Sequence, residues 1–140
     1  MSLMAAAFLS SAIGSEKNLS IGSKAPKIMT IEGSNVVADA KSEGKTTVVS
    51  FWTPKNPASR IANLQLSRKY GEMNEETNFI SICTDSDDIL MNAVMKKDGT
   101  DKEIHYSSSQ LSSRVMKDYG VEENPKAFLI GNDGKIKDIL

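Results

Sequence analysis

The run TTVVSFWT (Thr46–Thr53) constrains the fold more than any other part of this chain. It is rich in β-branched and aromatic residues and apolar on both faces at its centre, which is typical of a strand covered on both sides of a sheet. Asn56 and Pro57 follow, and Ala58–Tyr70 then reads as an amphipathic helix that ends at Gly71. Its apolar positions are Ile61, Leu64, Leu66 and Tyr70. We therefore predict a central strand that leads directly into a helix packed on the sheet.

The remaining elements alternate between strands and helices. The other expected strands are Lys27–Glu32, Asn35–Ala40 (a weak strand or a turn), Asn78–Asp85, Glu103–Ser107, Pro125–Gly131 and, after an Asn132-Asp133-Gly134 hairpin turn, the final KIKDIL. The other expected helices are one capped by Asp85, Ser86 or Asp87 that runs to Lys97 with Ile89, Leu90, Ala93 and Val94 facing inward, and one over Ser108–Gly120. This order predicts an α/β fold with a mixed central sheet flanked by helices.

The chain divides into a short leader and one domain. Residues 1–18 begin with MSLMAAAFLSSAIGS, which is small, apolar and uncharged. We interpret this stretch as a leader or cloning remnant, with the tail of a signal peptide as the alternative. Residues 19–140 form the predicted domain, which is long enough to bury a core without staples.

Composition excludes several kinds of site. The chain has 17 basic and 18 acidic side chains and no basic run, so no nucleic-acid partner is implied. Cys83 and His105 are the only residues of their types, which excludes an internal disulfide and a Cys or His metal cluster. Asp85, Asp87 and Asp88 read as a capped helix start rather than a cation site. No apolar run is long enough to span a membrane, and we expect no metal and no cofactor.

Four motifs together carry a resemblance to a known family. They are IGSKAPKIMTIEG (Ile21–Gly33), GKTTVVSFWTPKNPASR (Gly44–Arg60), FISICTDSDD (Phe79–Asp88) and YGVEENPKAFLIGNDGKI (Tyr119–Ile136). Their order and spacing resemble the thioredoxin-like superfamily, and within it the bacterial TlpA/ResA-type thiol–disulfide oxidoreductases and the related AhpC/TSA redoxins. The resemblance covers nearly everything after Leu19 and implies the thioredoxin fold and a cell-envelope or periplasmic location.

The resemblance also implies a Cys-x-x-Cys pair at the helix start, and this chain lacks it. In the family, the helix N-terminus stabilises a thiolate on the first cysteine and the second cysteine resolves the mixed disulfide. The matching positions here are Asn56 and Ser59. Neither is a thiol, so dithiol exchange is chemically impossible at this turn. Asn56 instead suits an N-cap and Pro57 the first helical position.

A second family feature points to a binding groove. The resemblance implies a cis bond between Asn124 and Pro125, which would hold a groove open for an extended peptide. We predict that Trp52, Asn56, Pro57, Asn124 and Pro125 line this groove. Such a groove could outlast the loss of the thiols, because strand addition uses backbone groups.

Two functions follow from these observations. The first is a non-catalytic envelope module that binds an extended peptide or protein partner. The alternative is a thiol–disulfide oxidoreductase or peroxidase with residual activity through Cys83, although a cysteine in a strand is most often a small buried apolar residue. The sequence leaves the oligomeric state and the partner's identity open.

Overall fold

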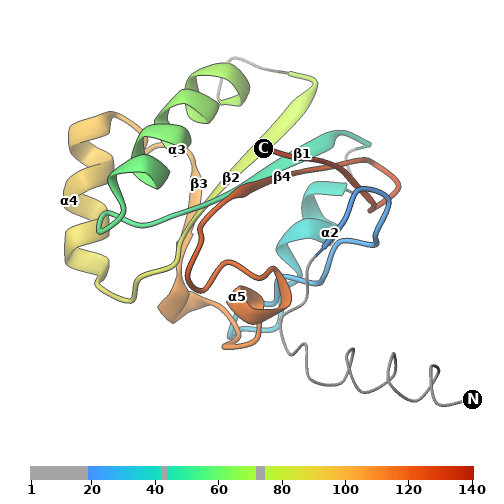
Figure 1. The fold of residues 1–140 in the computed structure, drawn as a ribbon, viewed down its shortest axis with the longest axis horizontal. Coiled ribbons are helices and arrows are strands. Elements are labelled where there is room, and N and C mark those ends of the chain that lie inside the picture. The colour runs from blue at the N-terminus through green and yellow to red at the C-terminus, as the bar shows by residue number, and fades with distance from the viewer. Residues whose placement is uncertain (1–18, 42–43, 72–74) are drawn as a thin grey trace, which may run out of the picture.

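A mixed five-stranded sheet with helices on both faces forms the framework of the molecule (Figure 1). The computed structural model describes residues 19–41, 44–71 and 75–140, so the expected leader (1–18) lies outside the described residues. The strands are β1 (Thr46–Trp52), β2 (Thr77–Cys83), β3 (Ile104–Ser107), β4 (Ala127–Ile130) and β5 (Ile136–Ile139). Their order is β3-β2-β1-β4-β5. The β2 and β3 pairings are parallel, whereas β4 and β5 run antiparallel to their neighbours, which confirms the predicted fold class.

The central strand is covered on both faces, as its sequence predicts. Val48 and Val49 point to opposite faces and are both fully buried. On one face, Phe51, Tyr119 and Phe128 form an aromatic cluster with ring centroids 5.1–6.0 Å apart. The helices α2 (Val36–Lys41) and α5 (Val115–Asp118) lie on this side, whereas α3 (Pro57–Tyr70) and α4 (Asp88–Asp98) cover the other (Figure 1).

The helix α3 packs on the sheet through polar residues, which corrects the amphipathic pattern expected for it. Its buried residues are Ser59, Asn63 and Ser67, which are spaced four apart and therefore share one face of the helix. Ile61, expected to pack inward, is 56% exposed. The Ser81 hydroxyl on β2 donates to Asn63 Oδ1, and the Ser67 hydroxyl donates to Glu103. The predicted start near Ala58 and the stop at Gly71 are confirmed.

Two further expectations were wrong, one in the type of element and one in the face that a helix buries. Asn35–Ala40 is not a strand, because Val36 and Val37 enter the core from the helix α2. In α4, Met91 and Met95 face the sheet, and Ile89 is 84% exposed.

The expected helix over Ser108–Gly120 is interrupted. It divides into a 3-10 turn (Ser108–Gln110) and the short α5, because Leu111 pairs with Thr30 and the Ser112 amide donates to the carbonyl of Met29. Of the strand expected at Lys27–Glu32, only isolated bridges at Met29 and Thr30 remain.

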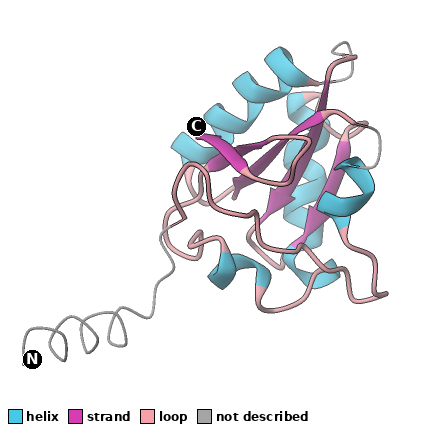
Figure 2. Cartoon of the chain, turned by 90° about the vertical axis from the view of Figure 1, so that its right-hand side faces the viewer, coloured by secondary structure: helices cyan, strands magenta, loops and turns pink. Residues whose placement is uncertain are grey.

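The start of the described chain is joined to its last strand. The Gly22 amide donates to Ile136 O, and the Ile136 amide donates to Ser23 O, both at 2.8 Å. An antiparallel bridge between Lys24 and Lys135 continues this pairing. The segment therefore lies along the outer edge of β5 (Figure 2). In the described part of the chain, no helix has the length and apolar character needed to cross a membrane.

Candidate functional site

The junction between β1 and α3 has the geometry of a capped helix start. Asn56 is the N-cap, and its Oδ1 accepts a hydrogen bond from the Ser59 amide at 3.0 Å. Pro57 occupies the first turn, where its missing N–H leaves no helical hydrogen bond unmade. Asn56 and Ser59 are thus placed at the start of the helix that follows the Trp52 strand, as predicted.

The Ser59 hydroxyl is fully occupied by backbone contacts. It accepts a hydrogen bond from the Thr53 amide at 3.0 Å and lies 2.8 Å from the carbonyl of Asn56, to which it can donate. The Thr53 carbonyl, at 3.2 Å, is a second acceptor within reach. The lone histidine, His105, lies on β3 with its Nδ1 2.7 Å from Glu103 O. Ser59 therefore holds the turn together rather than acting as an activated nucleophile.

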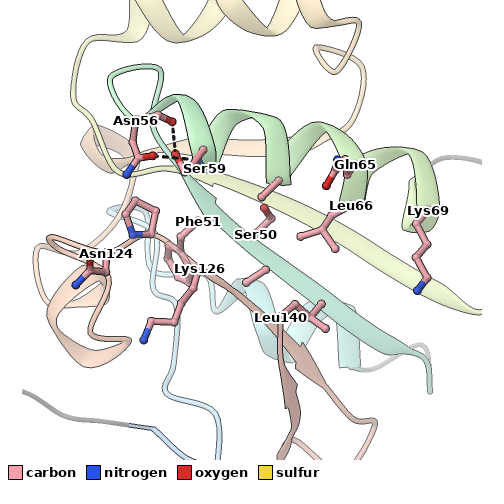
Figure 3. Close-up of a pocket in the computed structure, with 14 residues that line it drawn as sticks. Ser50, Phe51, Asn56, Ser59, Gln65, Leu66, Lys69, Asn124, Lys126 and Leu140 are labelled. Carbon is pink, nitrogen blue, oxygen red and sulfur yellow. Dashed lines mark hydrogen bonds between the residues drawn. The ribbon is translucent and has the colours of Figure 1, made fainter.

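A pocket of about 490 Å³ opens beside this junction (Figure 3). Asn56 lines it from the start of α3, and Asn124 and Pro125 line it from the segment that leads into β4. Three of the five predicted binding residues are therefore brought together. Trp52 and Pro57, the other two, are not among the lining residues.

Sequence reasoning missed much of the pocket wall. The lining also includes Ala58, Ala62, Gln65, Leu66 and Lys69 of α3, together with Lys126 and Leu140. The signal was present as a stripe, because positions 58, 62, 65 and 69 recur every three or four residues and so share one face of a helix. This stripe was missed because Ile61 and Leu64 were predicted to form the face of the helix that packs on the sheet.

Trp52 lies on the other side of the junction and is only 1% exposed. It packs in a small cluster with Cys83, Met91 and Met95. Its indole Nε1 is buried and has no hydrogen-bond partner among the described residues. Trp52 is therefore a packing residue between the sheet and α4 rather than a wall of the pocket.

Cys83 is buried in the same cluster with 0% of its surface exposed. Burial raises the pKa of its thiol to about 11, mainly because the thiolate would be desolvated there. The thiol is thus neutral and inaccessible near pH 7, which is the opposite of a reactive cysteine.

The peptide bond before Pro125 differs from the expected one. No cis peptide bond occurs in the described ranges, which include Asn124 and Pro125. The expectation of a cis-proline is therefore wrong for this structure. The trans isomer is also the intrinsically favoured one, by about 0.5–1 kcal/mol for a bond before proline.

The acidic residues after β2 serve the chain locally, as expected. Asp87 caps α4 by accepting from the Leu90 amide at 3.0 Å. Lys55 Nζ lies 2.9 Å from Asp85, and this hydrogen bond lowers the pKa of the Asp85 carboxyl and raises that of Lys55. These contacts tie the β1–α3 turn to the loop that precedes α4.

Several solved structures with the same fold are described as thiol–disulfide oxidoreductases or thioredoxin-like proteins. The thioredoxin domain of a thiol-disulfide oxidoreductase from Bacteroides vulgatus superposes with a TM-score of 0.69, at 22% identity over 87% of this chain and 89% of that one. A thioredoxin-like protein from Parabacteroides distasonis gives 0.70 at 24% identity over 87% and 88%. A Chlorobium tepidum protein assigned as the thiol:disulfide interchange protein DsbE gives 0.66 at 19% identity over 87% and 85%.

At these identities the likeness establishes the fold alone. Among curated proteins, none matches the sequence significantly. The model of the AhpC/TSA family, by contrast, matches residues 21–139, which is most of the chain. Three observations agree: the mixed sheet of thioredoxin type, the helix start at the position of the family's redox turn, and this match. The chain therefore belongs to the AhpC/TSA family and has lost both cysteines of the thioredoxin-like active site.

Proposed function

We propose that this chain is a non-catalytic thioredoxin-like module that binds an extended peptide segment of a protein partner. The observation that carries the proposal is that an open pocket lies beside a turn that has no thiol. Ser59 uses its hydroxyl to hold the turn, whereas Asn56, Asn124 and Pro125 surround a cavity of about 490 Å³. The pocket can thus hold an extended peptide, but it contains no group that could react with that peptide.

The alternative, residual redox activity through Cys83, has less support. A thiol with 0% exposure and a pKa near 11 offers neither access nor thiolate near pH 7. In addition, it has no second cysteine with which to resolve a mixed disulfide.

We further propose that the module works in a bacterial cell envelope. The support comes from similar folds, which include a thiol-disulfide oxidoreductase from Bacteroides vulgatus and a Chlorobium tepidum protein assigned as DsbE. Fractionation of cells that express the gene with its native upstream sequence tests this. Recovery of the protein only in the cytosol would contradict the envelope assignment.

One experiment separates the binding function from the enzymatic one. Insulin reduction with dithiothreitol should show no turnover above the buffer rate, and Cys83→Ser should give the same trace. Turnover that disappears in Cys83→Ser would establish the enzyme instead.

The binding function is tested with an array of immobilised peptides of mixed sequence. The protein should bind a subset of them, and Asn124→Trp should abolish this binding because it fills one end of the pocket. Asn92→Trp places the same side chain on the exposed face of α4 and serves as the matched control. An array without any bound peptide, or equal loss in both variants, would count against the pocket.

A further inference from the structure

The strand β3 lies at one end of the sheet and has only β2 as a neighbour among the described strands. An edge strand has backbone groups on its outer side that can pair with a strand of another chain. The opposite end of the sheet is already covered, because residues 22–25 pair with β5. The outer edge of β3 is therefore where another strand could extend this sheet.

Side chains occupy two of the backbone groups on this outer edge. The Ser107 amide donates to Gln110 Oε1 at 2.9 Å, which marks Ser107 as an outward-facing position. The backbone groups of successive strand residues point to alternate sides, so Glu103, His105 and Ser107 all face outward. His105 Nδ1 lies 2.7 Å from the Glu103 carbonyl oxygen. Because a carbonyl oxygen can only accept, this nitrogen carries the proton and donates.

The two occupied groups are the ones that a second copy of β3 would need. In an antiparallel pair of β3 strands with a twofold axis at His105, each Ser107 amide faces the Glu103 carbonyl of the other copy. The two His105 residues face each other, and their amides and carbonyls complete a ladder of four hydrogen bonds. The Gln110 and His105 side chains take the donor and the acceptor of the two outer bonds, so half of this ladder is blocked.

The side chains of β3 are complementary in the same register. Ile104 would lie directly opposite Tyr106 of the other copy, on one face of the extended sheet. Ile104 is apolar and yet 56% exposed, whereas Tyr106 is partly buried against the core. A β-branched side chain opposite an aromatic one stabilises an antiparallel strand pair. The side chains thus favour the pairing that the two occupied backbone groups oppose.

We propose that Gln110 and His105 keep the outer edge of β3 closed and so prevent two copies of the chain from joining their sheets. The occupant that they exclude is a second copy of β3 in the antiparallel register centred on His105. Two side chains thereby protect an edge that would otherwise pair with itself. This inference does not depend on the proposed peptide-binding function.

Removal of both side chains should open the edge. We expect the double variant His105→Ala/Gln110→Ala to dimerise in a dilution series followed by sedimentation velocity, reaching twice the mass of the parent. Urea unfolding of both proteins verifies that the variant is folded. The control is Ser109→Ala, because the Ser109 hydroxyl bonds to Asp88 and to the Ser107 hydroxyl. It loosens the same 3-10 turn, leaves both backbone groups occupied and should keep the parent's mass.

Two further substitutions test the register, each made together with Gln110→Ala. His105→Lys should restore the mass of the parent, because like charges directly opposite each other destabilise a strand pair. His105→Cys should oxidise to a disulfide-linked dimer, since paired Cα atoms lie about 5.5 Å apart in an antiparallel ladder, within the range of a disulfide. Ile104→Cys should link more slowly, because the two copies of this residue are not opposite each other.

Three results would overturn the inference. The first is a folded double variant that keeps the parent's mass at every concentration. The second is equal dimerisation of Ser109→Ala, which would assign the effect to a loosened turn. The third is a dimer that survives His105→Lys. If the double variant does not fold, hydrogen exchange of Gln110→Ala decides: the Ser107 amide should exchange faster than in the parent, and unchanged exchange would show that Gln110 does not close this edge.

Discussion

At the scale of single residues, the turn after β1 shows how a helix start is held together by side chains that carry no ionisable group. Asn56 caps the helix through its side-chain oxygen, and Ser59 joins the end of the strand to the first helical turn. The backbone still presents a helix N-terminus at this point, with the partial positive charge that favours an anion. This turn has no ionisable side chain at Asn56 or Ser59, but it has the helix N-terminus that would act on one.

A thiol returned to this position should therefore be acidified. We expect Asn56→Cys, made in a Cys83→Ser background, to have a thiol pKa below the ordinary value of about 8.5. The measurement is the rate of iodoacetamide alkylation as a function of pH. Asn92→Cys, on an exposed face of α4, is the control and should titrate near the ordinary value. A pKa for Asn56→Cys at or above that of the control would show that the turn no longer favours a thiolate.

Cys83 should make the protein sensitive to alkali. Its folded pKa of about 11 lies above the unfolded value of about 8.5, so the folded state holds the proton more tightly. The resulting stability is present below about pH 8.5 and is lost as the pH rises toward the folded pKa. Between pH 8.5 and 10.5, the free energy of unfolding should fall by about 2 kcal/mol more in the parent than in Cys83→Ala. Urea titrations at both pH values measure this, and parallel falls would contradict it.

At the scale of elements, α3 departs from the usual rule that a helix meets a sheet through apolar side chains. Its buried stripe is Ser59, Asn63 and Ser67. On the sheet, the Ser81 hydroxyl of β2 donates a hydrogen bond to Asn63. A buried polar group costs stability unless it is hydrogen-bonded. These contacts therefore fix the position of α3 by pairing specific groups, and through α3 they fix the wall of the groove.

A double-mutant cycle tests this pairing. Ser81→Ala leaves the buried Asn63 oxygen without its donor and should cost about 1–2 kcal/mol, and Asn63→Ala should cost a similar amount. The double variant should be less destabilised than the sum of the two by about 1 kcal/mol, because the second change no longer breaks a bond. Urea unfolding gives all four free energies. Ser81→Ala combined with the exposed Asn92→Ala should be additive, and additivity in the Asn63 pair would mean that the hydrogen bond contributes nothing.

Sequence reasoning predicted the elements whose signals are local. The β1 run, the Asn56 cap, the Gly71 stop and the hairpin before β5 follow from β-branched content, capping chemistry and turn residues. It failed where distant contacts decide the outcome. The pairing of Leu111 with Thr30 interrupts a helix that Ser108–Gly120 would otherwise form.

The groove was predicted in part, for the same reason. Asn56, Asn124 and Pro125 were identified through motifs, whereas the α3 stripe required knowledge of which helix face meets the sheet. Polar residues occupy that face, so hydrophobic periodicity pointed to the wrong side.

At the scale of the whole molecule, the aromatic cluster joins distant parts of the chain. Phe51 comes from β1, Phe128 from β4 and Tyr119 from the segment between α5 and β4. The Tyr119 hydroxyl donates to Pro26 O at 2.6 Å, which ties this core to the N-terminal segment. Burial raises the pKa of the Tyr119 phenol above its usual range, so the group stays neutral and keeps its donor proton.

Removal of that hydroxyl should loosen the connection without emptying the core. Tyr119→Phe should lower the free energy of unfolding by about 1 kcal/mol, since Pro26 O loses a buried partner while the ring remains. Thermal and urea unfolding measure the change. Tyr106→Phe, on the edge strand β3, should change it by less than about half as much. Equal effects of the two substitutions would assign the loss of stability to aromatic packing rather than to the hydrogen bond between Tyr119 and Pro26.

The pairing of residues 22–25 with the start of β5 has a mechanical consequence. The two segments run antiparallel, so their outer ends, near residues 20 and 140, leave the domain on the same side. Tension applied between those ends would load the bonds at Gly22 and Ser23 one after another, as in unzipping, rather than all at once in shear. Under such tension, the pairing of residues 22–25 with β5 would break first. The parallel β1–β2 pair at the centre of the sheet lies away from the line of force and would still be intact.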